Sequence, residues 1–301
     1  MLADMSLTES EVFEQLRPEL VKLAYRMTGL WTEAEDLVQE AWLRFSTQKV
    51  DSARPYLYRV VTRLCLDHLK SARHRREAYV GPWLPEPMVE IGVDEEVEAV
   101  EQLTLGLMVA LEHLSPLERA AFLLHQVYGY AYSEIGALLG RSEAACRKLS
   151  SRARARLQER RPRLDSAPSQ PSGVLFDLVQ AVRSGDVERV VTFLREDAVL
   201  TTDGGGKAIA ALRPVLGRDK IARFFVGIAR KASPAARLLS ARVGGLPGLV
   251  IFEGEACVSA MAFEIQEGKL GSIWIMRNPD KLTSVRPAES APSRWAESAP
   301  G

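Results

Sequence analysis

The chain has 301 residues, in which 39 Lys and Arg balance 39 Asp and Glu, and 47% of the residues are hydrophobic. This length suits two or three compact domains, and the composition excludes a fibrous or wholly disordered chain. The three cysteines, Cys65, Cys146 and Cys257, lie too far apart for a local metal pair or a disulfide framework, so we expect a reducing compartment and no metal or cofactor. Without a signal peptide or an apolar run of ~20 residues, the sequence predicts a cytoplasmic protein that does not contact membranes.

The charge is segregated along the chain. Residues 51–77 contain seven basic and three acidic side chains, residues 81–114 contain eight acidic ones and no Lys or Arg, and residues 141–163 contain nine basic and two acidic ones. Two basic blocks separated by an acidic one indicate two surfaces that bind a polyanion such as nucleic acid. Solvated helix faces would give the same pattern, so charge alone leaves both interpretations open.

Apolar residues at helical spacing predict three helices in the first 78 residues. The first runs from about Glu9 to Met27, the second is expected to begin at a cap formed by Thr32, and the third runs from about Pro55 to Ala72. Residues 79–93 are rich in Pro and Gly, which predicts a linker rather than a helix.

A second helical part occupies about residues 94–160. Ser115 followed by Pro116 and Glu118 predicts a capped helix start. A short helix from Ser133 is expected to stop at Gly140, and Ser142 is expected to cap a basic helix that reaches about Leu157. Two short helices across a tight turn are typical of a helix-turn-helix. In the second helix one face is apolar, with Cys146, Leu149, Ala153 and Leu157, and this phase leaves the polar side chains outside.

The remainder of the chain changes character after a Pro/Ser-rich linker at residues 163–172. Helical patterns are followed by probable strands, which predicts an α+β domain with helices packed on a curved antiparallel sheet. The expected helices are Val174–Arg183, Val187–Leu194 and Asp219–Arg230, and the expected strands are Ala236–Val243, Gly248–Gly254, Ala256–Ile265 and Lys269–Met276. Residues 283–301 are expected to be a disordered tail.

Two stretches carry a family resemblance. Residues 20–77, with the run AEDLVQE at residues 34–40, resemble region two of the bacterial extracytoplasmic-function sigma factors, and residues 114–157 resemble their region four. The C-terminal part resembles the SnoaL-like extension, of the nuclear-transport-factor-like fold, that one subgroup of these factors carries. The subgroup's marks are WLPEP (Trp83–Pro87), DGGGK (Asp203–Lys207) and NPDKL (Asn278–Leu282). The resemblance implies two all-α domains followed by an α+β cone.

The implied layout divides the chain into six parts: region two at 1–78, a linker at 79–97, region four at 98–162, a second linker at 163–172, the SnoaL-like domain at 173–282 and the tail at 283–301.

The resemblance also implies roles for named residues. Core RNA polymerase, through its β′ clamp helices, is expected to contact Asp36, Leu37, Gln39 and Glu40, and the β flap is expected to contact region four. The −10 promoter element is expected to contact Tyr56, Tyr58, Arg59, Arg63, Lys70, Arg73, Arg75 and Arg76. Tyr56 and Tyr58 could equally be core aromatics. The −35 element is expected to contact Arg141, Ser142, Glu143, Arg147, Lys148, Ser151 and Arg152.

For the extension, the resemblance implies a regulator fused in cis that makes a separate anti-sigma protein unnecessary. The expected contact residues are Trp83, Leu84, Pro85, Glu86, Pro87, Asp203, Gly204, Gly205, Gly206, Lys207, Asn278, Pro279, Asp280, Lys281 and Leu282. The extension contains no His or Tyr, which argues against enzymatic proton transfer. The alternatives are a DNA-binding module fused to a cyclase or isomerase, and an extension that senses a small ligand.

Overall fold

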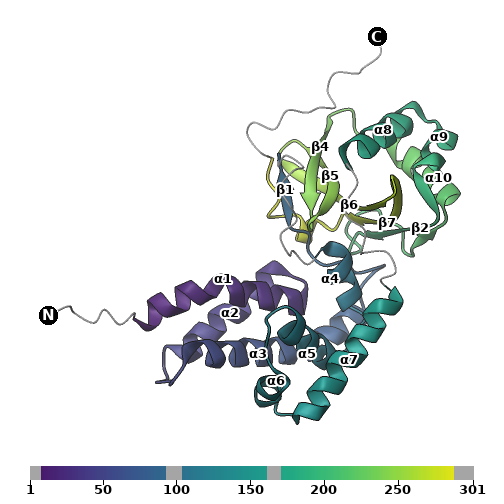
Figure 1. The fold of residues 1–301 in the computed structure, drawn as a ribbon. Helices are drawn as coiled ribbons and strands as arrows, with labels where there is room; N and C mark the ends of the chain where they lie inside the picture. Colours follow the sequence, from purple (N-terminus) through teal and green to yellow (C-terminus); the bar gives the residue numbers. More distant parts are fainter. Residues whose placement is uncertain (1–7, 93–103, 161–170, 288–301) are drawn as a thin grey trace. The chain divides into compact units, whose positions relative to one another are not determined.

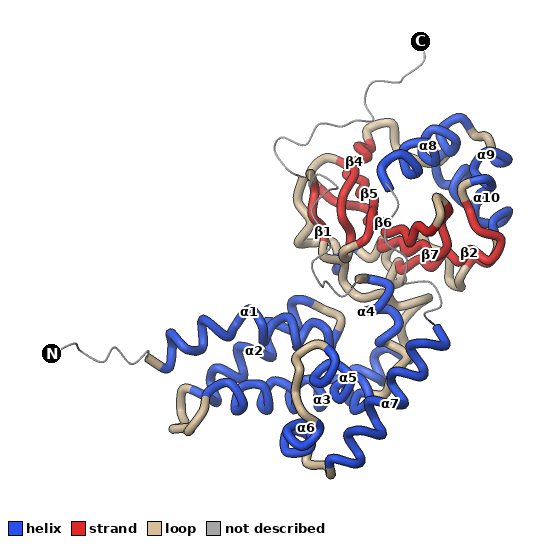
Figure 2. The backbone as a smooth tube through the Cα atoms, in the orientation of Figure 1, coloured by secondary structure: helices blue, strands red, loops and turns tan. Residues whose placement is uncertain are grey.

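The computed structural model describes residues 8–92, 104–160 and 171–287. The chain divides into two compact units. The first unit comprises residues 1–78 and 110–161, and the second comprises residues 79–109 and 162–301. Figure 2 shows that the described part of the first unit is helical and that the strands belong to the second unit.

Three long helices form one part of the first unit: α1 (Glu9–Thr28), α2 (Trp31–Phe45) and α3 (Ala53–Glu77). A capping box between Thr8 and Glu11 starts α1, and Gly29 in the left-handed conformation ends it. The expected cap at Thr32 is wrong, because α2 begins at Trp31 and its N-cap residue, Leu30, makes no side-chain cap. The hydroxyl of Thr28 instead donates to the carbonyls of Ala24 and Leu30 and holds the turn between the helices.

The second part of the first unit contains α5 (Pro116–Gln126), α6 (Tyr132–Leu139) and α7 (Glu143–Arg160), drawn in teal in Figure 1. The capping box of Ser115 and Glu118 is confirmed, as is the cap of α7, where the Ser142 hydroxyl accepts from the Ala145 N–H at 3.2 Å. Gly140 ends α6 with φ 64°, so the tight turn of the helix-turn-helix is present. Cys146, Ala153 and Leu157 are buried, which confirms the predicted phase of α7.

The second unit is built on one seven-stranded sheet of order β1-β4-β5-β6-β7-β2-β3. Its strands are β1 (Val89–Ile91), β2 (Leu194–Asp203), β3 (Val215–Leu216), β4 (Ala236–Val243), β5 (Leu246–Glu253), β6 (Ala256–Gln266) and β7 (Lys269–Met276). The four predicted strands are confirmed with small shifts at their ends. These four strands pair antiparallel, as predicted, and the sheet as a whole is mixed because β2, which the sequence did not predict, pairs parallel with β7. Leu194 opens β2, so the helix expected over Val187–Leu194 ends earlier.

Each face of this sheet buries its own apolar layer. On one face lie α8 (Pro171–Ser184), α9 (Val187–Thr192) and α10 (Arg218–Ala229) (Figure 1). Beneath them the apolar layer includes Met261, Phe263 and Ile273. The other face contains Phe252 and Trp274, and it is covered by Leu84, Leu105, Leu282 and Val285. Residues from far apart in the chain therefore complete the domain.

Residues 79–97 were expected to form a linker, and residues 98–162 were expected to belong to region four. The structure instead includes Tyr79–Val109 in the second unit, where β1 pairs antiparallel with β4 (Val89 opposite Val243). Leu105 begins α4 (Leu105–Leu111) and donates its N–H to the Gly244 carbonyl at 2.7 Å. This grouping has a physical cause: the apolar side chains of this Pro-rich segment gain free energy by covering the sheet. Residues 93–103, which include the end of the expected linker and the start of the expected region four, lie outside the described residues.

The expected tail also begins later than predicted. Val285 is 6% exposed, packs on the second face of the sheet and donates its N–H to the Leu282 carbonyl. The remainder of the expected tail from residue 288 lies outside the described residues. Among the described residues, no helix has the length and apolar character needed to span a bilayer, and no cluster of three or more His, Cys, Asp or Glu could hold a metal ion.

Candidate functional site

The outer face of α2 carries the residues expected to contact core polymerase. Asp36, Gln39 and Glu40 are exposed. Leu37 is buried at 9% exposure and belongs to the core, so it cannot offer its side chain to a partner in this conformation. One turn beyond Glu40, Leu43 is 60% exposed, and helical spacing puts it beside Asp36, Gln39 and Glu40. This face combines acidic and amide groups with one large apolar side chain.

On α3, the expected −10 residues Arg59, Arg63 and Lys70 are exposed. Arg59 and Arg63 line a hollow of about 390 Å³ together with Tyr56, with Arg44 in the last turn of α2 and with Gln48 just after that helix. The Tyr56 hydroxyl donates to Gln48 Oε1 at 3.0 Å, which fixes its ring at the edge of the hollow. The side chains of Arg73, Arg75 and Arg76 lie outside the described part of α3.

Tyr58 is a core residue, and its expected role in stacking on bases is wrong for this conformation. Its side chain is fully buried and its hydroxyl donates to Glu19 Oε2 at 2.8 Å. Burial and the Glu19 hydrogen bond raise the pKa of Tyr58 well above its usual value. Its ring lies 5.6 Å from that of Tyr128 and 5.3 Å from that of Tyr130. The phase of Tyr58 with Val61 and Cys65 on α3 could have revealed this.

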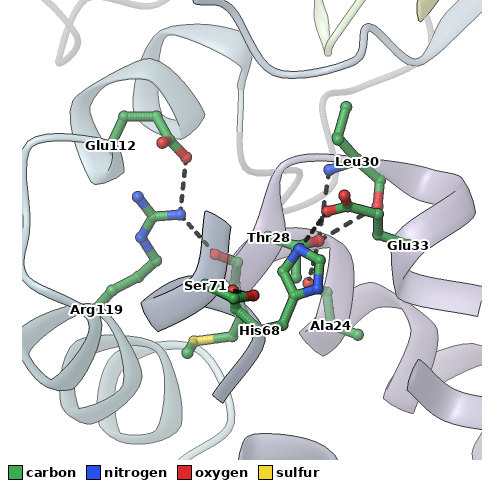
Figure 3. A network of polar contacts seen from close by, with 9 residues as sticks. Ala24, Thr28, Leu30, Glu33, His68, Ser71, Glu112 and Arg119 are labelled. Carbon is green, nitrogen blue, oxygen red and sulfur yellow. Dashed lines mark hydrogen bonds and ion pairs between the residues drawn. The ribbon is translucent and has the colours of Figure 1, made fainter. Parts of the chain in front are cut away.

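Helices of the two parts of the first unit are joined by Arg119 of α5, which is 2% exposed (Figure 3). Its guanidinium donates to the Met27 carbonyl in the last turn of α1 at 2.6 Å and to Glu112 at 2.7 Å. A cation at the carbonyl end of a helix is favourable both as a hydrogen-bond donor and for the helix dipole. Nearby, His68 of α3 and Glu33 of α2 lie 2.6 Å apart, which links the long helices to each other.

On α7 and the turn before it, all seven expected −35 residues are exposed: Arg141, Ser142, Glu143, Arg147, Lys148, Ser151 and Arg152. Arg156 forms an ion pair with the buried Glu118 of α5 at 2.6 Å, so it supports the packing of α7. Arg141 also lines a hollow of about 550 Å³ together with Arg63 and Lys70 of α3. Side chains expected to read two different promoter elements therefore share one hollow.

In the second unit, the carboxylate of Asp203 at the end of β2 is fully buried and accepts four hydrogen bonds. Oδ1 accepts from the Tyr79 hydroxyl at 2.6 Å and from the Gly205 N–H at 3.0 Å. Oδ2 accepts from the Leu84 N–H at 2.9 Å and from the Lys281 ammonium at 2.8 Å. Such complete pairing is what a buried charge requires.

Lys281 completes the site from the other side. Its Nζ also donates to the Leu84 carbonyl at 2.6 Å and lies 4.1 Å from the centre of the Trp83 ring and 5.1 Å from that of Tyr79. The ammonium is therefore held by a carboxylate, a carbonyl and two aromatic rings. Burial, and next the hydrogen bond to Asp203, raise the pKa of Tyr79 above its usual value, so its phenol stays a donor near neutral pH.

The glycines of DGGGK are required by this geometry. A Cβ on Gly204 would lie 2.3 Å from the Ala208 carbonyl oxygen, and Gly205 has φ 59° and lies against the Asn278 amide. The Asn278 amide donates to the Tyr79 hydroxyl at 2.8 Å. The conformation of this loop brings Asp203 to residues 79–84. The close contacts around the loop account for the three glycines, so a phosphate ligand is not needed to explain them.

The structure brings the expected WLPEP, DGGGK and NPDKL residues together within the second unit. Leu84, Pro85, Glu86 and Pro87 are buried, and Leu282 packs on the same sheet face as Leu84. Gly206 faces Val80, whereas Lys207 and Asp280 form an exposed ion pair, next to Pro279. The sequence did not predict a role for Tyr79, because its partner Asp203 lies 124 positions away. No motif near Tyr79 in the sequence indicates this contact.

Comparison with known proteins agrees with this architecture. The Sigma-70 region 2 family model matches residues 12–75, and the Sigma-70 region 4 model matches residues 105–157. The chain is 41% identical over 294 residues to the ECF RNA polymerase sigma factor SigJ of Mycobacterium tuberculosis, covering 91% of this chain and 93% of that protein. It is 31% identical over 277 residues to the probable ECF RNA polymerase sigma factor SigI of the same species, covering 90% and 93%.

Among solved structures, the crystal structure of M. tuberculosis SigJ matches with a TM-score of 0.72 and 36% identity over the structurally aligned residues. The match covers 91% of this chain and 98% of that one.

Two helical sigma regions, the second with a helix-turn-helix, followed by an α+β domain define a transcription initiation factor that binds core RNA polymerase and promoter DNA. More particularly, the chain belongs to the ECF RNA polymerase sigma factors, and its C-terminal unit contains a SnoaL-like domain. The protein is accordingly not an enzyme.

Proposed function

We propose that this sigma factor is regulated in cis by its second unit, through the contact of residues 79–84 with Asp203 and Lys281. The observation that carries the proposal is the complete pairing of the Asp203 carboxylate with Tyr79, Leu84 and Lys281. The segment between region two and region four is held by the C-terminal domain, so release or retention of this segment would change how freely the two regions separate. Because the regulator is part of the chain, no separate anti-sigma protein is needed in this proposal. The proposed location is the cytoplasm, where polymerase and promoter meet.

The proposed polymerase contact is the exposed face of α2, with Asp36, Gln39 and Glu40 as polar contacts to the β′ clamp helices. Leu43 replaces the buried Leu37 as the apolar anchor in this proposal, because the exposed apolar surface of Leu43 gains free energy when a partner removes it from water.

Replacing Leu43 with Ala is therefore expected to weaken binding to core polymerase about fivefold or more, since truncation at an interface centre costs at least about 1 kcal/mol. The binding constant can be measured with labelled protein and purified core polymerase. The matched control is Leu216→Ala, because Leu216 is also 60% exposed but lies on β3 of the second unit. Equal affinity of both variants with the unaltered chain would contradict the assignment of Leu43.

For promoter recognition we propose that the hollow between α2 and α3 takes an unpaired base of the −10 element. Arg44, Arg59 and Arg63 supply positive charge for phosphates, and the Tyr56 ring offers a stacking surface. The exposed face of α7 is proposed to enter the major groove at −35, and the β flap is the proposed polymerase partner of region four.

The first unit must open before both elements are bound, in this proposal. Arg63 and Arg141 line one hollow of about 550 Å³, so both face the same small space in this arrangement. Promoter elements about 20 base pairs apart are separated by roughly 65–70 Å at about 3.4 Å per base pair. A closed and an open arrangement give a regulator two states to choose between.

In vitro transcription with core polymerase and a cognate promoter tests the proposal. The intact chain is expected to yield RNA, and Trp83→Ala is expected to change that yield several-fold, because removing the ring from the buried Lys281 ammonium loosens residues 79–84. Lys207→Ala, which breaks the exposed ion pair with Asp280, is the control and should transcribe like the intact chain. RNA from the intact chain with an unchanged yield from Trp83→Ala would refute cis regulation by this contact.

A further inference from the structure

Arg147 is held in one orientation on the exposed face of α7. Its Nη2 donates to Glu143 one turn earlier, and the centre of its guanidinium lies 5.2 Å from the centre of the Tyr132 ring. In contrast, the side chains of Lys148, Ser151 and Arg152 make no hydrogen bond or ion pair with the described residues. Arg147 therefore differs from its neighbours in being contacted at an edge by a carboxylate and at a face by an aromatic ring.

Tyr132 is itself supported by the preceding helix. Its ring stacks on that of His125 with centres 4.0 Å apart and an interplanar angle of 29°. His125 Nδ1 lies 2.9 Å from the Tyr130 carbonyl oxygen, which fixes the imidazole ring. The three stacked groups come from α5, α6 and α7, so the stack connects these three helices at the surface that carries the expected −35 residues.

Orientation matters for an arginine that reads DNA. A guanidinium recognises guanine through two parallel hydrogen bonds, which require its plane to lie in the plane of the base. An unrestrained side chain loses rotamer freedom when it adopts that geometry, whereas a side chain held beforehand loses less. The carboxylate of Glu143 also offsets the positive charge of Arg147. Arg147 therefore contributes more to base recognition than to the general electrostatic attraction of the protein to phosphates.

We propose that Tyr132, supported by His125, is a positioning residue that sets the plane of Arg147 and thereby the base preference at one position of the −35 element. This inference rests on the proposed reading of −35 by α7. It assigns a role in specificity to a residue outside the recognition helix.

The test compares −35 preferences of the holoenzyme made from the full chain, with each base of the element varied in turn. Arg147→Ala identifies the position that Arg147 reads. Tyr132→Leu removes the aromatic face and is expected to reduce discrimination at that same position about two- to fivefold, with other positions unchanged. Tyr132→Phe keeps the ring and is the matched control, with an expected preference like that of the unaltered chain. In the double variant Arg147→Ala/Tyr132→Leu, no loss beyond that of Arg147→Ala is expected.

A Tyr132→Leu variant that lowers binding equally at every position, or whose loss adds to that of Arg147→Ala, overturns the positioning role and leaves −35 reading by Arg147 standing. If Arg147→Ala leaves the whole preference profile unchanged, the proposed −35 role of Arg147 fails first and the positioning role fails with it. Thermal unfolding of each variant separates loss of folding from loss of preference, because misfolding would lower binding to all promoters alike.

Discussion

Replacing Asp203 with Ala is expected to lower the free energy of unfolding of the second unit by about 3–5 kcal/mol. The Asp203 carboxylate is fully buried and pairs with Lys281, which is 4% exposed. Without the carboxylate, the buried ammonium of Lys281 would lose its ion-pair partner, while its contacts with the Leu84 carbonyl and two aromatic rings would remain. The Tyr79 hydroxyl and the Leu84 N–H would lose their acceptor as well.

The measurement is denaturant unfolding followed by hydrogen exchange of amides in β4–β7, which reports the second unit separately from the helices. The chain offers a close control, because Lys207 and Asp280 form another ion pair between the same two motifs. That pair is 57% and 61% exposed, so Asp280→Ala is expected to cost at most about 1 kcal/mol. If both substitutions cost the same, Asp203 does not anchor the contact.

A double substitution that removes both charges separates two contributions to stability: the ion pair itself, and the cost of leaving one buried charge without its partner. In Asp203→Leu/Lys281→Met no buried charge is left unpaired, so this double variant is expected to be more stable than Asp203→Ala. Tyr79 and the Leu84 N–H would still lack an acceptor, which keeps it below the unaltered chain. A double variant less stable than Asp203→Ala would contradict this account.

Local pattern predicted the strands β4–β7 well. Each strand is rich in apolar residues, and Gly245, Gly254 and Gly268 lie in the turns between them with positive φ. The helix-turn-helix was predicted for a similar reason, since Gly140 and Ser142 mark its turn. These features depend on residues a few positions apart.

The features that could not be predicted depend on contacts between residues far apart in the sequence. After Leu194, the strand β2 continues with Arg195, Glu196 and Asp197, which are not typical of a strand, and β2 pairs parallel with β7. The strand β1 lies in a Pro-rich segment and forms only because β4 offers an edge. Among the site residues, the exposed side chains of α7 and the burial of Leu37 followed from helical phase, whereas the role of Tyr79 depends on tertiary packing.

Ending the chain at Arg163 is expected to produce a protein that self-associates and binds hydrophobic dyes. Removal of the sheet would expose Leu84 and Leu105, which are 1% and 4% exposed in the intact chain, together with β1. Each fully buried leucine contributes about 1.5–3 kcal/mol, and contiguous apolar patches of this kind promote association. The helices of the first unit should keep their far-ultraviolet circular dichroism, because residues 79–109 belong to the other unit.

The control for this truncation is the same shortened chain with Leu84→Gln, Ile91→Gln and Leu105→Gln, which is expected to be monomeric by light scattering and to bind little dye. A plain truncation that is already monomeric and does not bind dye would contradict the covering role of the sheet. The comparison matters for regulation, because association alone would lower transcription by the plain truncation. Only the polar variant therefore reports the sign of the regulatory effect: more RNA than the intact chain would mean that the second unit restrains the sigma regions, and less would mean that it assists them.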